Sequence, residues 1–153
     1  MSHKTMVHRT TTLERTYAAS PQRTFHAWEN PEMRRIWGSP SDQVEIRNDA
    51  ADFRVGGEDI QTCLVEGHPV ATVHGRYHDI VPDARIVYTE VIRDDAQLQG
   101  MSLVSAEFIA EGTGTRLVVT LQTIAVDGSE LLAEVEIGWI SALDRLGALF
   151  VEA

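Results

Sequence analysis

The stretch DFRVGGEDIQTCLVEG, residues 52–67, places two adjacent glycines, Gly56 and Gly57, in a segment that otherwise alternates like a β-strand. Glycine weakens a strand interior, so the pair needs a physical reason. A phosphate-binding loop would require a helix directly after the glycines, with its N-terminus facing the anion. The residues that follow, EDIQTCLV, alternate with the period of a strand instead. The pair therefore predicts a bend in a strongly curved sheet rather than a nucleotide site.

The sequence on both sides of this stretch predicts strands with no helix between them after residue 44. Alternating segments rich in β-branched and aromatic residues are bounded by turn signals such as EGHP and VPDA. We expect strands near residues 8–19, 44–49, 52–65, 70–80, 85–93, 100–110 and 115–124. Strands this closely spaced indicate an antiparallel meander.

Helices are predicted in two places. SPQRTFHAW and NPEMRRIW, starting at Ser20 and Asn30, each begin with a capping residue followed by proline, which is typical of a helix start. These segments predict two short helices after the first strand. Over residues 129–152 the apolar positions recur with helical spacing. That helix would be about 36 Å long at the usual rise per residue, enough to cross a whole sheet.

Length and composition bound the function. The chain has 153 residues, and we expect one domain over residues 1–153, with residues 1–7 as a loose N-terminal tail. Acidic residues outnumber basic ones, 23 to 13, for a net charge of −10. We therefore expect neither nucleic acid nor a membrane as partner. No apolar run approaches the ~18 residues of a membrane span, and no secretory signal is evident. We expect a cytoplasmic protein.

Several stretches together resemble a known family. DFRVGG, VHGRYHDIVPDARIVYTE, GTGTRLVVTLQT and IGWISALDRLGAL are similar, in order and spacing, to bacterial homologues of the heat-shock-protein-90 ATPase activator. These belong to the START-like SRPBCC (Bet v 1-like) superfamily, and the likeness runs from about Leu13 to the C-terminus. It implies an α+β helix-grip fold: a curved, antiparallel seven-stranded sheet wrapped around a long C-terminal helix, with a cavity between them.

Glu90 is the candidate catalytic residue. It shares a strand face with Tyr88, and a carboxylate on an apolar inner face would have a raised pKa and could act as a general acid or base. Alternatively, the strand ends before RDDAQ and Glu90 lies in solvent, the usual place for acidic residues. Arg15, on the same face as Leu13 and Tyr17, could pair with Glu90 or hold an anionic ligand. Its alternative place is the sheet edge, in contact with water.

Metal and covalent chemistry have little support in the sequence. His74 and His78 would lie about 13 Å apart on a strand, too far to share a metal ion. Cys63 is the single cysteine, so an internal disulfide is excluded. We expect its side chain to be a small buried hydrophobe. No nucleophile-elbow motif is present. We expect no metal and no cofactor.

The aromatic residues support ligand binding. We expect a cavity lined by Trp28, Trp37, Phe53, Tyr77, Tyr88, Phe108, Leu121, Val135 and Trp139. Such a lining suits a small hydrophobic or aromatic molecule, whereas the alternative for each residue is plain core packing.

Three functions are therefore considered. The first is binding of such a ligand, and the second is a cyclase- or hydrolase-type enzyme that uses the carboxylate in the cavity. The third, a chaperone ATPase co-regulator, comes from the resemblance alone. The eukaryotic activator carries an additional N-terminal domain that this length does not accommodate, so we do not expect a chaperone partner. A homodimer is considered because an exposed edge strand needs cover.

Overall fold

The computed structural model describes residues 5–151 and contains seven strands and three helices. The elements, in chain order, are β1 (Val7–Tyr17), α1 (Pro21–Glu29), α2 (Pro31–Trp37), β2 (Glu45–Ala51), β3 (Glu58–Val65), β4 (His68–Val81), β5 (Arg85–Asp94), β6 (Gln97–Glu111), β7 (Gly114–Ala125) and α3 (Glu130–Val151). Residues 1–4 of the predicted tail lie outside the described part, and β1 already begins at Val7.

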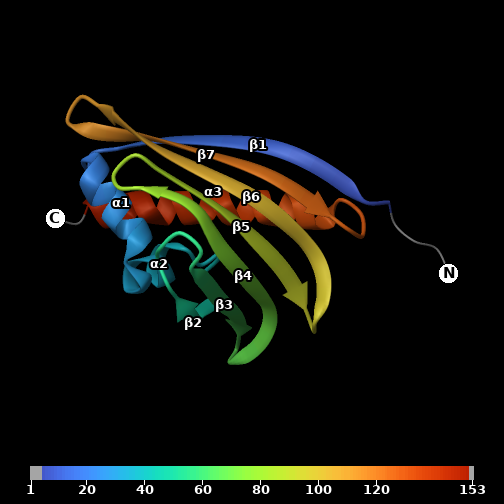
Figure 1. Ribbon diagram of the computed structural model, residues 1–153. Coiled ribbons are helices and arrows are strands. Elements are labelled where there is room, and N and C mark those ends of the chain that lie inside the picture. Colours follow the sequence, from blue (N-terminus) through green and yellow to red (C-terminus); the bar gives the residue numbers. More distant parts are fainter. Residues whose placement is uncertain (1–4, 152–153) are drawn as a thin grey trace.

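The strands form one antiparallel sheet in the order β1-β7-β6-β5-β4-β3-β2. β2 to β7 are a meander, and β1 pairs with β7, so β1 and β2 are the two edges of the sheet. Figure 1 shows the sheet curving across α3, with α1 and α2 near the C-terminal end of that helix. The predicted helix-grip fold is confirmed. No helix in the described range is long and apolar enough to cross a membrane.

The core lies between α3 and the half of the sheet formed by β1, β7 and β6. Val104 on β6 and Leu117 on β7 are fully buried there, as are Leu143 and Leu146 of α3. Burying each such side chain contributes about 1.5–3 kcal/mol. Because α3 packs on β1 and β7 at this edge, it leaves the opposite half of the sheet less closely covered.

The two short helices form as predicted, and their caps explain where they begin. The Ser20 hydroxyl accepts a hydrogen bond from the Arg23 N–H at 3.2 Å, and the Asn30 side-chain oxygen accepts one from the Met33 N–H at 3.0 Å. A proline follows each cap, at the first helical position. The Trp37 indole N–H donates to the Ala27 carbonyl at 2.8 Å, which ties α2 to α1.

The prediction of one strand over residues 52–65 was wrong in its first part. β2 continues to Ala51, and residues 52–57 form the turn into β3. Gly56 has a φ of +84°, a conformation that favours glycine, and a Cβ on Gly57 would overlap the Asp52 carbonyl oxygen. Both glycines hydrogen-bond to the Tyr77 backbone, at 2.8 and 3.1 Å. They fold this connection onto β4 instead of bending a strand.

The curvature assigned to the glycines has another source. The strand pairing skips Asp49 of β2 where it pairs with β3, and it skips Val70 of β4 where β4 pairs with β3. The pairing also skips His78 of β4 opposite β5, and Gln99 of β6 opposite β5. Each β-bulge bends its strand and increases the local twist. Four irregularities in consecutive strand pairs therefore curve this half of the sheet.

Candidate functional site

A cavity of about 290 Å³ lies between α3, α2 and the concave face of the sheet. Its floor is formed by inward-facing residues of β3, β4 and β5, and its roof by one face of α3 that includes Val135 and Trp139. It exists because α3 packs mainly on β1 and β7, at the other side of the sheet. The fold thus leaves a space between α3 and the concave face of the sheet.

Seven of the nine residues predicted to line the cavity do so: Trp28, Trp37, Phe53, Tyr77, Tyr88, Val135 and Trp139. Phe108 and Leu121 face inward but belong to the closed core, with 5% and 1% of their surface exposed. The Phe108 ring packs edge-on against Phe25 of α1, at a centroid distance of 5.3 Å. Leu121 lies on β7, which α3 covers directly. Helix packing therefore removes both from the cavity.

The three tryptophans of the chain meet at this cavity, one from each helix. Trp28 is at their centre, tilted against Trp37 at 5.0 Å and stacked on Trp139 at 5.9 Å between ring centroids. The Tyr88 ring, on β5, lies 6.5 Å from Trp28. The Trp28 indole N–H is buried and has no hydrogen-bond partner among residues 5–151. Three tryptophan rings thus concentrate on one side of the cavity.

A buried ion pair connects α2 to the sheet at the cavity wall. Arg34, 9% exposed, donates from Nη1 to the Tyr77 hydroxyl at 2.7 Å, and its Nη2 lies 2.5 Å from both carboxyl oxygens of Asp59. Burial raises the pKa of the Tyr77 hydroxyl well above its ordinary value, although the nearby Arg34 charge opposes that rise. Because the Asp59 carboxylate lies against its guanidinium, the positive charge of Arg34 is neutralised within the protein.

Glu90 lies in the cavity wall and not in solvent, because β5 continues past it to Asp94. In the sheet register Gly75 pairs with Asp59 on one side and with Glu90 on the other. Glu90 has no hydrogen bond or ion pair with any described residue. Burial raises its carboxyl pKa to about 7, with the Asp59 charge adding to the shift and Arg34 opposing it. Glu90 therefore titrates near neutral pH.

Comparison with known proteins identifies the family. Residues 18–151 match the family described as Activator of Hsp90 ATPase homolog 1-like protein. The chain belongs to this family. The resemblance predicted from the sequence is thereby confirmed.

Solved structures agree with the AHSA1-like assignment. A Rhizobium loti protein is 35% identical with a TM-score of 0.82, and the match covers 94% of this chain and 98% of that one. A Rhizobium leguminosarum protein is 30% identical with a TM-score of 0.77, covering 93% and 96%. The AHSA1 protein from Silicibacter pomeroyi, 21% identical with a TM-score of 0.75 and coverage of 94% and 98%, supports the fold alone. No curated protein matches the chain.

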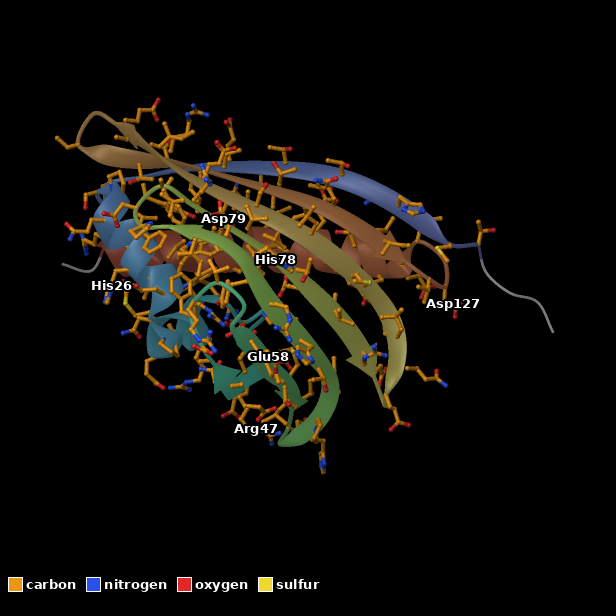
Figure 2. The ribbon with its side chains drawn as sticks, in the orientation of Figure 1. His26, Arg47, Glu58, His78, Asp79 and Asp127 are labelled. Carbon is orange, nitrogen blue, oxygen red and sulfur yellow. The ribbon has the colours of Figure 1, made fainter. Side chains whose placement is uncertain are left out.

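Other candidate residues of this AHSA1-like chain lie elsewhere. Arg15 does not meet Glu90. Its Nε donates to Asp144 of α3 at 3.2 Å, on the far side of the core. His78 (Figure 2) and His74 both lie on β4 with exposed side chains. Residues 5–151 contain no group of three or more His, Cys, Asp or Glu side chains able to hold a metal ion.

Sequence reasoning missed Arg34, Asp59 and the exposure of Cys63 to the cavity. Cys63 is half-buried in the lining, and its thiol pKa is raised by burial and, to a smaller degree, by Glu90. A signal for Arg34 was present, since it stands three residues before Trp37 and therefore shares its buried helix face. Asp59 alternates with Gln61 and Cys63, which puts all three on the inner face of β3.

Proposed function

We propose that this AHSA1-like protein binds a small, largely apolar organic molecule in the cavity between the sheet and α3. The observation that carries the proposal is the 290 Å³ of interior space lined by all three tryptophans of the chain. This volume is close to the lower end of the range found for small-molecule sites, about 300 Å³. Protein interiors otherwise have few voids larger than a water molecule.

The chemistry of the lining supports the same conclusion. Aromatic rings and aliphatic side chains form most of the wall, and only a few polar groups interrupt them, among them Glu90 and the Arg34–Asp59 pair. Binding sites typically combine an apolar wall with a small number of placed polar groups that orient the ligand. Family membership is compatible with ligand binding and with a co-chaperone role, and the cavity favours the former.

Tryptophan fluorescence tests this proposal directly, because every tryptophan of the chain lines the cavity. The probe is the neutral, apolar fluorophore N-phenyl-1-naphthylamine, which accepts energy from excited tryptophan. We expect saturable quenching of tryptophan emission with a 1:1 stoichiometry. Emission that declines without saturation, as it would from collisions in solution, would contradict a cavity site.

Acid–base catalysis on the bound molecule is a second candidate function, favoured by the position and pKa of Glu90. A carboxyl group with a pKa of about 7 can both donate and accept a proton at neutral pH. The variant Glu90→Gln keeps the size of the side chain and removes proton transfer. If Glu90 is catalytic, a molecule recovered from the cavity should be converted by the wild-type protein and only bound by the variant.

A further inference from the structure

We propose that the group recognised in the cavity is a protonated amine, held by the Glu90 carboxylate while the apolar part of the ligand packs against the aromatic wall. This inference rests on the proposed function, since it names the chemical class of the ligand in the same cavity. It follows from the distribution of charge, from the position of the rings and from the partners that each polar group already has.

The charges in the lining favour a cation. Four charged side chains line the cavity, one basic and three acidic: Arg34, Asp59, Glu90 and Glu134. Arg34 is already bonded to both Asp59 oxygens and to the Tyr77 hydroxyl, so it has little capacity left for an anionic ligand. Asp59 is neutralised by the same pair. The charge left over in the wall is therefore negative.

Two acidic groups of the lining have no ionic partner among the described residues, and of these Glu90 is half-buried whereas Glu134 is exposed. The ionisable groups around it are Arg34 on α2, Asp59 and Cys63 on β3, Tyr77 on β4, Tyr88 on β5 and Glu134 on α3. Its direct cross-strand neighbours are Gly75, which has no side chain, and Ser102, whose hydroxyl is bonded to Thr123 at 2.9 Å. A carboxylate withdrawn from water is unfavourable without a cation or donor beside it, and a ligand ammonium would supply both to the half-buried Glu90.

Aromatic rings lead away from Glu90 toward the tryptophans. Tyr88 precedes Glu90 by two positions on the same strand face, and its ring lies 5.6 Å from Tyr77 and 6.5 Å from Trp28. The faces of such rings attract cations, most strongly where water is excluded. A ligand with an ammonium at Glu90 and a ring or short chain toward Trp28 would use both features. The net charge of −10 also attracts cations to the protein.

Three probes of matched shape test the proposal: 2-phenylethylamine, 2-phenylethanol and 3-phenylpropionate, which are cationic, neutral and anionic at pH 8. Binding to the full chain is measured by titration calorimetry. We expect the amine to bind at least tenfold more tightly than the alcohol, and the propionate to bind most weakly. Amine affinity should rise by up to about tenfold from pH 6 to pH 8, the change in ionised fraction of a carboxyl group with a pKa of about 7.

Two variants decide which residue is responsible. Glu90→Gln should bind the alcohol as the wild type does, which shows an intact cavity, and should lose the preference for the amine. Glu107→Gln, an exposed glutamate on the outer face of β6, is the matched control and should keep that preference.

Equal binding of amine and alcohol, or tightest binding of propionate, would overturn the amine proposal and leave ligand binding intact. Binding of none of the three probes would also overturn it, and the naphthylamine titration would then decide the proposed function separately.

Discussion

Asp59 and Glu90 flank Gly75 in one row across the sheet. Of these two carboxylates, only Asp59 has a cationic partner in the described part of the chain. Their strands are separated by β4 alone, which puts the two backbones roughly 10 Å apart. Because Gly75 has no side chain, the β4 position between them in this row places no side chain between the two carboxylates. Arg34 pairs with Asp59, and Glu90 is left half-buried, with a carboxyl pKa raised to about 7.

The first prediction concerns stability as a function of pH. The carboxyl pKa of Glu90 is about 7 in the folded protein against an ordinary value of 4.5, so between these pH values the folded state holds a proton that the unfolded state has lost. Stability from this group is therefore full below pH 4.5 and falls as pH rises toward 7 and above. We compare the free energy of unfolding of Glu90→Gln with that of the wild type. Raising the pH from 5 to 8 should shift this difference by about 1–3 kcal/mol in favour of the variant. Urea unfolding at both pH values measures this, and a pH-independent difference would contradict it.

A second prediction compares two adjacent arginines. Arg34→Met leaves the Asp59 carboxylate without its partner in the wall, and we expect a loss of about 3 kcal/mol in the free energy of unfolding. Arg35→Met removes only an exposed pair with Glu32 and should cost about 0.5 kcal/mol or less. Thermal or urea unfolding of both variants makes the comparison. Similar losses for the two would mean that the buried pair does not fasten α2 to the sheet.

A third prediction concerns filling the cavity. Val135→Phe adds volume from α3 into the space, and we expect at least a tenfold weaker affinity for N-phenyl-1-naphthylamine. Val70→Phe makes the same chemical change at an exposed site on β4, and the affinity should not change. Both proteins are titrated by tryptophan quenching. Equal affinities in the two variants would place the probe outside this cavity.

A fourth prediction separates the two glycines of the β2–β3 turn. Gly56→Ala meets no atom within 4 Å, so its cost is that of a positive φ alone, about 1–2 kcal/mol. Gly57→Ala places a Cβ against the carbonyl oxygens of Asp52 and Arg54, and we expect a larger loss because backbone must move. Denaturant midpoints rank the variants. A milder effect at Gly57 than at Gly56 would contradict this account of the turn.

The sequence carried enough information for the architecture because periodicity reports burial directly. Alternation identified the strands and the face that Tyr88 shares with Glu90, and Ser20 followed by Pro21 identified a helix start. The β2–β3 turn was misplaced because Gly56 and Gly57 follow residues that alternate up to the turn. Propensity does not distinguish a glycine turn from a bend within one strand.

The site was harder to predict because it depends on packing between elements that are distant in the chain. Phe108 and Tyr88 both face inward, but whether α1 or empty space covers each ring depends on where the helices cross the sheet. The partnership of Arg34 with Asp59 joins α2 to β3 across 25 positions of sequence. Local patterns place each side chain on a face and do not identify its partner across the cavity.

Native mass spectrometry of the protein purified from its own host shows whether the cavity holds a small molecule, without assuming its identity. We expect a recurrent small molecule at close to one per chain, released on denaturation and absent from Val135→Phe. An empty wild-type protein that also fails to bind N-phenyl-1-naphthylamine would contradict it.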